Sequence, residues 1–272
     1  MSVFQTAAQS LKTSNRRIVV MGAKGSGKTT FSISASTFAG DTISGGKREC
    51  ADTLLIQGDS EGVLGAMDVG LDVPHVLDMT ACEEWSQYQA LLIKGLTELR
   101  PKLLDGTIKV IVIDLAYPAR LIEQHVQPKD VAGWGAVKVE GSKLYRALAG
   151  IKGVTVVANC QIKSSAQIIP NETAKTSSEA RSVGGELSTF TMALTNGIAE
   201  LWRDNASFIF TREAKRGQAD SKGNATPATY ATLTQASKRW QAASRAKSVL
   251  DAKLDGDMSL RAILNRVYGE SA

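Results

Sequence analysis

The sequence predicts an α/β protein with a mostly parallel central sheet flanked by helices. Short apolar runs rich in β-branched residues recur along the chain, and segments with helical character separate them. Continuous apolar strands that alternate with helices are typical of a parallel sheet covered on both faces. A glycine-rich stretch directly follows the first apolar run, in the place where phosphate-binding loops occur. Together these observations predict a nucleotide-binding α/β fold.

The predicted strands and helices alternate through the first three quarters of the chain. We expect strands at 17–21, 53–58, 108–114, 153–160 and 206–211, and helices at 28–40, 83–104, 117–126 and 141–151. Apolar residues in the second of these helices recur with helical periodicity. After residue 211 the pattern changes, and we expect a hairpin around 216–227, a strand at 229–234 and a basic helix at 237–254.

The expected domain organisation is a single core with two appended segments. Residues 1–15 are expected to be a flexible N-terminal segment, 16–235 the core, and 236–272 a basic helical tail. Residues 163–190 are rich in Ser, Thr and Gly, which predicts a long mobile loop. Loops of that length are usually functional or disordered.

Composition limits the possible environments and partners. Hydrophobic residues make up 43% of the 272 residues, yet no apolar run approaches the length of a membrane span, and the first residues lack the apolar centre of a secretory signal. We therefore expect a cytoplasmic protein that does not enter membranes. Three widely separated cysteines fit neither a disulfide framework nor paired metal ligands. A net charge of +5 slightly favours polyanionic partners.

The stretch GAKGSGKT, residues 22–29, fits the phosphate-binding pattern G-x-x-x-x-G-K-[ST] between a strand and a helix. Its glycines would let backbone amides fold around phosphates, with the following helix directing its positive end at them. Lys28 would bridge the β and γ phosphates of a nucleotide, and Thr29 would bind Mg²⁺. The predicted nucleotide-binding residues are Gly22, Ala23, Lys24, Gly25, Ser26, Gly27, Lys28, Thr29 and Thr30.

Carboxylates follow two of the predicted strands. Asp114 ends the run VIVID, the position that contacts Mg²⁺ in P-loop proteins, while Asp59 and Glu61 follow TLLIQG. Because ligands of open α/β sheets bind at the carboxyl ends of the strands, we expect all three carboxylates beside the phosphate loop. Asp59 is a further candidate metal ligand, and one of Asp59 and Glu61 could activate the attacking water. The alternative is that both cap the next helix.

Several segments resemble the RecA family of ATPases. The stretch LIQGDSEGVLG resembles the RecA segment in which a strand ends in Asp-x-Glu and the glutamate is the catalytic base, a role that falls on Glu61. The stretch VVANCQIKSS is similar to the strand that ends in a γ-phosphate sensor and continues into a DNA-binding loop, which puts Gln161 at the sensor position. The resemblance is greatest to phage-encoded RecA-like ATPases that assist single-strand annealing and recombination in a bacterial host.

The RecA resemblance implies partners as well as a reaction. It implies binding of ATP and Mg²⁺, binding of single-stranded DNA, and self-association into a filament or ring, with a single-strand-binding protein as a further candidate partner. The stretch FIFTREAKRG resembles a strand whose basic residues reach the neighbouring protomer's nucleotide; the candidates for this trans role are Arg212, Lys215 and Arg216.

Two segments are candidates for DNA contact by their place in the RecA order. The first is a loop at 126–141, where two lysines surround a tryptophan, a combination suited to phosphate contact and base stacking; core packing is the alternative for that tryptophan. The second is the loop at 163–190, whose charge is close to neutral. The candidate residues are Lys129, Trp134, Lys138, Lys163, Lys175 and Arg181.

Three functional classes stay open on the sequence alone. The first is an ATP-hydrolysing DNA-binding protein of RecA type, and the second is a small-molecule kinase, although no compact Arg-rich lid is present. The third is a nucleotide-gated switch whose partner is a protein, which the near-neutral segment 163–190 suits equally well.

Overall fold

The computed structural model describes residues 16–59, 61–168, 186–194, 196–215, 228–235, 243–244 and 250–269. Several predictions lie outside this part of the chain. They are the flexible segment 1–15, the candidate residues Lys175, Arg181 and Arg216, the tip of the hairpin around 216–227, and most of the basic stretch 237–249.

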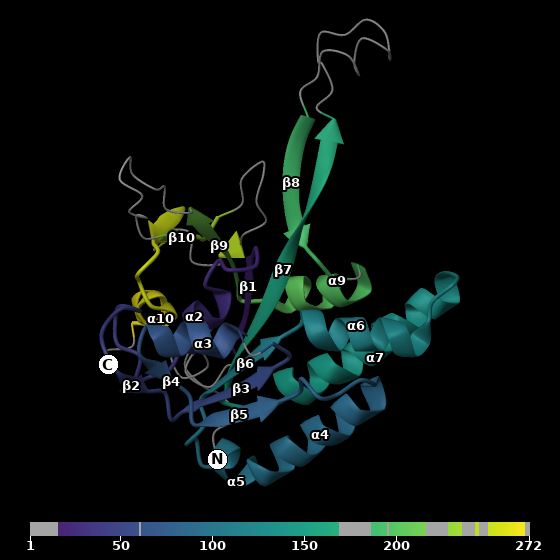
Figure 1. Ribbon diagram of the computed structural model, residues 1–272, viewed down its shortest axis with the longest axis horizontal. Helices are drawn as coiled ribbons and strands as arrows, with labels where there is room; N and C mark the ends of the chain where they lie inside the picture. Colours follow the sequence, from purple (N-terminus) through teal and green to yellow (C-terminus); the bar gives the residue numbers. More distant parts are fainter. Residues whose placement is uncertain are drawn as a thin grey trace, which may run out of the picture.

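The described residues form a ten-stranded, mostly parallel sheet with helices packed against it, so the predicted α/β class is confirmed (Figure 1). The strand order is β12-β10-β9-β1-β7-β6-β3-β5, with β8 paired to β7 and β11 paired to β9. The strands are β1 (Arg17–Gly22), β3 (Thr53–Gln57), β5 (His75–Asp78), β6 (Val110–Asp114), β7 (Thr155–Ile168), β8 (Glu186–Met192), β9 (Phe208–Lys215), β10 (Thr229–Leu233), β11 (Ala243–Ser244) and β12 (Lys253–Asp255). A separate pair consists of β2 (Arg48–Glu49) and β4 (Leu71–Asp72).

All five strands predicted before residue 212 are present as β1, β3, β6, β7 and β9. They pair in parallel, and β1 lies between β7 and β9. The register aligns Gly22 with Gln161 and Asp114 with Asn159. The carboxyl ends of β1 and β6 therefore lie beside residues 159–161 of β7 at one edge of the sheet, and the predicted nucleotide-binding residues adjoin this edge.

Two helical layers cover the two faces of the sheet. One apolar core packs α2 (Lys28–Ile33), α3 (Glu61–Asp68) and α10 (Leu260–Tyr268) against the sheet. A second core packs α4 (Trp85–Glu98), α5 (Arg100–Leu104), α6 (Ala116–Val126), α7 (Val131–Ala149) and α9 (Asn196–Asn205) against the opposite face. Burial on both faces explains why the central strands read as unbroken apolar runs. Within the described ranges, none of these helices combines the length and apolar character that crossing a bilayer requires.

Two helices in the first half of the chain differ from the prediction in their boundaries. The helix expected at 28–40 ends at Ile33, and the next residue's hydroxyl, Ser34 Oγ, donates to Phe31 O at 2.6 Å. The helix expected at 83–104 is divided at Leu99, because Pro101 has no amide N–H to continue the hydrogen-bond ladder of α4 and lies instead in the first turn of α5.

The loop predicted at 126–141 is wrong. The helix expected at 141–151 begins at Val131, and the turn between α6 and α7 spans only 127–130. Asp130 starts α7 by accepting a hydrogen bond from the Gly133 amide at 2.8 Å. Two glycines in the first turns of α7 lower the helix propensity there, and the Asp130 cap stabilises the start of the helix.

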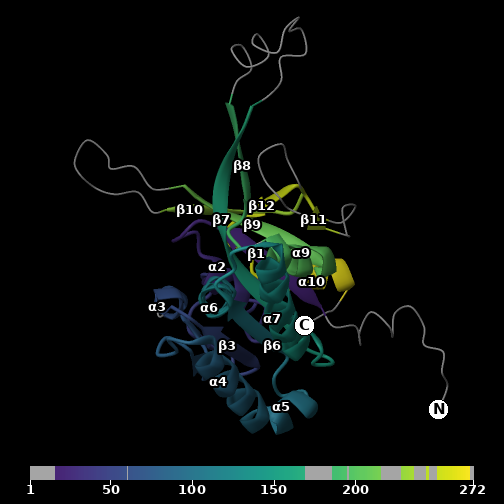
Figure 2. The same cartoon turned by 90° about the vertical axis from the view of Figure 1, so that its right-hand side faces the viewer.

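The prediction of a long loop at 163–190 is also wrong at both ends of that range, where the residues belong to strands. Strands β7 and β8 pair antiparallel from Ile162 with Met192 to Ile168 with Glu186, and they form a two-stranded arm. Figures 1 and 2 show this arm rising away from the body of the molecule. The sequence of these two paired segments is rich in serine and threonine and contains no unbroken apolar run, so the signal that identified the buried strands is absent. We call β7 residues 162–168 together with β8 the arm.

The region after residue 211 is confirmed only in part. Strands β9 and β10 form the expected antiparallel hairpin. The basic helix predicted at 237–254 is wrong where the structure describes it, because Ala243–Ser244 pairs with β9 and Lys253–Asp255 pairs with β10. The C-terminal helix is α10, and Leu260 and Ile263 are buried in the core beside Phe31. The described part of the predicted tail thus completes the sheet edge and the core.

Candidate functional site

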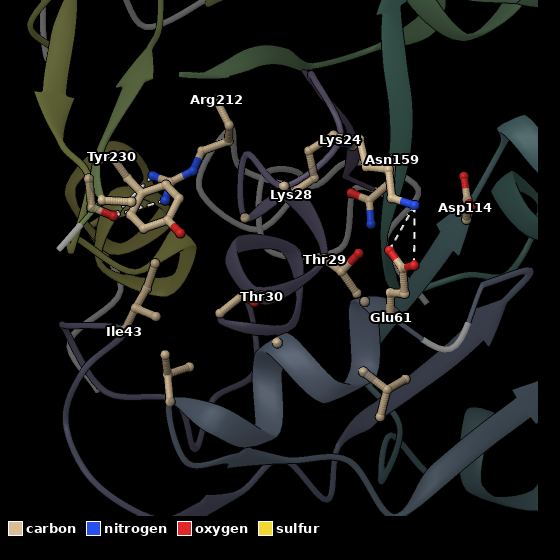
Figure 3. Close-up of a pocket in the computed structure, with 18 of the residues that line it drawn as sticks. Lys24, Lys28, Thr29, Thr30, Ile43, Glu61, Asp114, Asn159, Arg212 and Tyr230 are labelled. Carbon is tan, nitrogen blue, oxygen red and sulfur yellow. Dashed lines mark hydrogen bonds and ion pairs between the residues drawn. The ribbon is translucent and has the colours of Figure 1, made fainter. Parts of the chain in front are cut away.

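A cavity of about 840 Å³ opens at the carboxyl ends of the parallel strands (Figure 3). One end is formed by the glycine-rich loop, residues 22–27, together with α3 and the ends of β6 and β7. The other end is formed by the turn at 43–44, by β10 and by residues 255–257. We call these the catalytic end and the nucleoside end after the roles proposed for them below.

The glycine-rich loop turns through backbone conformations that favour glycine. Gly25 and Gly27 have φ of 77° and 74°, and Gly27 precedes the first residue of α2. At Gly22 a side chain would overlap Ser26 Oγ and would come within 2.7 Å of the Arg212 carbonyl oxygen. The close fit between this loop and β9 therefore depends on the absence of a side chain at residue 22.

The side chains of α2 lie at the floor of the catalytic end. Lys28 Nζ donates to the Ala23 carbonyl at 2.8 Å, so the lysine folds back over the loop. Burial lowers the pKa of Lys28, and the negative charge of Asp114 opposes this shift. Gly62 of α3 lies so close to Thr29 that a Cβ there would be 2.7 Å from Thr29 Oγ1, which keeps the hydroxyl beside α3.

Asp114 lies beneath Lys28 at the end of β6. Burial raises the pKa of Asp114, while the Ala116 amide, which donates to Asp114 Oδ1 at 3.0 Å, and the charge of Lys28 lower it. The Asp114 carboxylate therefore accepts a hydrogen bond at the start of α6 and offsets the positive charge of Lys28. Both are the expected neighbours of a phosphate-bound cation.

The carboxylates after β3 lie at the start of α3, and both line the cavity. Asp59 Oδ1 accepts a hydrogen bond from the Glu61 amide at 2.9 Å, so Asp59 begins α3 as a helix cap would. Glu61 lies in the first turn of α3 and also lines the cavity. Its Oε2 lies 2.9 Å from Lys24 Nζ, an exposed ion pair drawn as dashed lines in Figure 3.

Strand β7 brings two polar residues to the cavity. Gln161 is exposed at the rim, as its predicted position requires. Asn159, which the sequence analysis missed, is 3% exposed, and its Oδ1 accepts a hydrogen bond from Ser32 Oγ at 2.6 Å. Period-two alternation along β7 was the available signal, because Asn159 and Gln161 share one face of the strand.

Arg212 lies inside the cavity of its own chain. Its side chain is 2% exposed, Nη1 donates to Thr232 Oγ1 at 2.7 Å, and both Nη atoms donate to the Gly256 carbonyl at 3.0 Å. The guanidinium carbon lies 4.7 Å from the centre of the Phe31 ring and 5.5 Å from that of Tyr230. Burial lowers the pKa of Arg212 to about 10. The guanidinium is therefore held by residues of its own chain.

The structure does not describe the side chains of the other two candidates for the trans role. Lys215 ends β9, and its side chain is outside the described atoms, as is all of Arg216.

The nucleoside end contains residues that no motif predicted. Tyr230 on β10 presents a ring that is 41% exposed, and Asp257 accepts hydrogen bonds from Ser44 N at 3.0 Å and from Ser44 Oγ at 2.7 Å. Ile43 lines the same end. These residues come from three distant parts of the chain, so no local spacing connects them.

The described DNA candidates lie outside the cavity. Trp134 is 48% exposed on α7, which contradicts core packing, and Lys138 on the same helix lies 3.6 Å from Glu200. Lys129 is exposed in the turn before α7, and Lys163 is exposed at the base of the arm.

The donor set of the catalytic end suits a cation that shares its ligands with phosphate. Among the described residues, no three His, Cys, Asp or Glu side chains gather as a metal site built from protein alone would require. Thr29 and Asp114 instead offer hard oxygen atoms beside the loop, and Mg²⁺ usually takes only one or two protein ligands together with phosphate oxygens and water. The residues present therefore fit Mg²⁺ bound with a nucleotide.

Compared with known protein families and with curated proteins, the chain matches none.

Proposed function

We propose that this protein is a Mg²⁺-dependent ATPase with a RecA-like P-loop core that binds single-stranded DNA and acts in phage recombination or annealing. The observation that carries the proposal is the catalytic end of the cavity. It joins Lys28, Thr29, Glu61, Asp114 and Gln161, which four separate segments deliver to one edge of a parallel sheet.

The phosphates of ATP would lie on the backbone amides of the glycine-rich loop and on Lys28. The lysine already reaches back to the loop carbonyl of Ala23, a contact that a phosphate oxygen can replace with a stronger, charge-assisted one. Thr29 and Asp114 would hold Mg²⁺, with Asp59 as a further candidate. When bound, the metal supplies positive charge to the β and γ phosphates.

Glu61 is the group best placed to accept a proton from the attacking water. It lines the cavity across from Lys28, and its exposed ion pair with Lys24 is weak enough to open. On release from Lys24 its carboxylate would take the water's proton as the oxygen attacks the γ phosphorus, while the bond from that phosphorus to the β–γ bridging oxygen breaks and ADP leaves with the electron pair. Gln161 would donate a hydrogen bond to the γ phosphate, as its position at the rim allows.

The arm supports the coupling to DNA. Strand β7 carries Asn159 and Gln161 in the cavity and continues without interruption into the arm, where Lys163 is exposed. A ligand shifts a conformational equilibrium only when it binds the two states differently, and Gln161 would make that difference through the γ phosphate. We propose that ATP favours a self-associated, DNA-binding state and that hydrolysis releases it.

Steady-state ATP hydrolysis with Mg²⁺, measured with and without single-stranded DNA, tests the proposal. We expect DNA to stimulate hydrolysis, and Lys28→Ala to abolish it. Lys152→Ala, which removes an exposed lysine at the opposite end of β7, is the matched control and should leave the rate unchanged. Undiminished hydrolysis in Lys28→Ala would remove the assigned site.

The same assay separates the two alternatives. Transfer of the γ phosphate to a nucleoside or nucleotide would indicate a kinase. Hydrolysis with no binding to single-stranded DNA at low salt, where electrostatic binding is strongest, would indicate a switch for a protein partner.

A further inference from the structure

Arg212 is a buried cation in the cavity that no described carboxylate neutralises by an ion pair. Each of its hydrogen bonds goes to a neutral acceptor, either the Thr232 hydroxyl or the Gly256 carbonyl, and Nε is buried without an acceptor. A guanidinium has five N–H donors, so these three bonds leave two for a ligand. Burying an unpaired charge is costly, which makes an anion the ligand that this position favours.

The position of Arg212 shows which part of a nucleotide it could reach. Residue 212 aligns with Gly22 across β9 and β1, and Arg212 Nη2 lies 3.7 Å from the point that a Cβ on Gly27 would occupy. Ring atoms of Tyr230 lie 3.5–3.6 Å from the same point, so Gly27, Arg212 and Tyr230 are mutual neighbours. Figure 3 shows the guanidinium between the glycine-rich loop and the nucleoside end, on the side away from Glu61 and Asp114.

A bound nucleotide would therefore pass Arg212 where the phosphate chain leaves the loop. With the terminal phosphate directed at Glu61, the phosphate bonded to the nucleoside is the one nearest the side of the cavity where Gly27, Arg212 and Tyr230 meet. A planar guanidinium can donate two parallel hydrogen bonds to such a phosphate.

We propose that Arg212 binds the nucleotide of its own chain and contacts the phosphate nearest the nucleoside. This inference rests on the proposed function, and it replaces the trans role that the RecA resemblance implied for this residue. Arg212 would thereby set the affinity for nucleotides over nucleosides, while Lys28 acts on the outer phosphates.

Calorimetric titration of adenosine, AMP and ADP into the wild-type chain and into Arg212→Met tests the contact. We expect the variant to bind AMP and ADP at least about tenfold more weakly, and adenosine within about threefold of the wild type. Arg17→Met is the matched control. Arg17 is a partly buried arginine that also donates to a carbonyl, Ala149 O at 3.2 Å, and lies 5.7 Å from a tyrosine ring, but at the opposite end of β1.

Three results would overturn the proposal. Equal losses for all three ligands would make Arg212 a purely structural link between β9, β10 and residue 256. A loss for ADP without a loss for AMP would place the contact on an outer phosphate, and no loss at all would remove it. If the wild-type chain binds none of the three ligands, the proposed function itself fails, which is a different outcome from any of these.

A mixing experiment distinguishes action within the chain from action on a neighbour. Lys28→Ala and Arg212→Met are combined in equal amounts and ATP hydrolysis is measured. If Arg212 served the neighbouring protomer, some interfaces would combine an intact Lys28 with an intact Arg212, and activity would return. We expect no return of activity. If thermal melting shows that Arg212→Met is unfolded, Arg212→Lys replaces it in the titrations. Lysine keeps the positive charge but lacks the two parallel N–H donors of the guanidinium. We expect this variant to lose less affinity, and only for AMP and ADP.

Discussion

The two ends of the cavity are built in different ways. The catalytic end comes from short segments at the ends of adjacent parallel strands, where Lys28, Glu61 and Asp114 each follow an apolar run. The nucleoside end comes from the turn at 43–44, the edge strand β10 and the turn after β12, which meet only after the chain has folded. The difference teaches that local sequence can specify the end of the cavity where we propose that phosphate binds, whereas the other end forms only through contacts between distant parts of the chain.

The sharpest way to test this division is Glu61→Gln. A general base contributes about 10²- to 10⁴-fold to a rate, so we expect kcat for ATP hydrolysis to fall by about 10³-fold with KM nearly unchanged. Glu98→Gln, which alters an exposed glutamate on α4, is the control. An unchanged kcat would reduce Glu61 to a first-turn residue of α3 and leave the catalytic end without its base.

Gly22→Ala tests how tightly the catalytic end is joined to β9. The new Cβ would meet the Arg212 carbonyl oxygen at 2.7 Å, and backbone cannot move aside as a flexible side chain can. We expect the free energy of unfolding to fall by about 1–3 kcal/mol and nucleotide binding to be lost. Gly135→Ala is the control, because a Cβ there meets no atom within 4 Å on α7, and it should raise stability by about 0.5–1 kcal/mol. Chemical denaturation would measure both; equal stabilities would contradict the close fit.

Tyr230→Ala tests the nucleoside end. If the exposed ring stacks on the base, its loss should raise KM for ATP by about tenfold and leave kcat within about twofold, since stacking is worth about 1–3 kcal/mol. Tyr230→Phe keeps the ring and should behave as the wild type. A fall in kcat with KM unchanged would mean that Tyr230 affects the reaction rather than nucleotide binding, so the two ends of the cavity would not have separate roles.

The smallest effect is expected from Lys24→Ala. The ion pair with Glu61 is exposed on both sides, and pairs of this kind contribute little. We expect kcat to change by less than about threefold, because Glu61 stays in the cavity without its partner. A loss as large as that of Glu61→Gln would show that Lys24 positions the carboxylate during the reaction.

The parts of the fold that the sequence predicted are those whose local pattern decides their structure. Strands β1, β3, β6, β7 and β9 are buried on both faces, so their apolar runs are visible without any knowledge of the partners. The arm was not predicted because its sequence is rich in Ser and Thr and contains no unbroken apolar run. Helix α7 was predicted ten residues short because its first turns carry two glycines and depend on the cap at Asp130.

The candidate site divides in the same way. Residues adjacent to a predicted strand end were found, whereas Asn159 was overlooked although it shares a face of β7 with Gln161. Arg212 was selected for its charge, but its environment depends on Thr232 and Gly256, which pairing of β10 and β12 brings beside it. Side-chain surroundings of that kind are set by strand order, which no local pattern records.

Because β7 runs without a break from the sheet into the arm, the arm moves together with the inner half of the strand. Hydrogen bonds to β1 and β6 fix the inner half of the strand, and a slip by one residue would turn every side chain to the wrong face, so the strand cannot slide. A disturbance at Gln161 can then act on the arm only by tilting or twisting it. Seven residues of strand extend about 23 Å at the usual rise of about 3.3 Å per residue, so a tilt of about 10° at the cavity would move the far end of the described arm by about 4 Å.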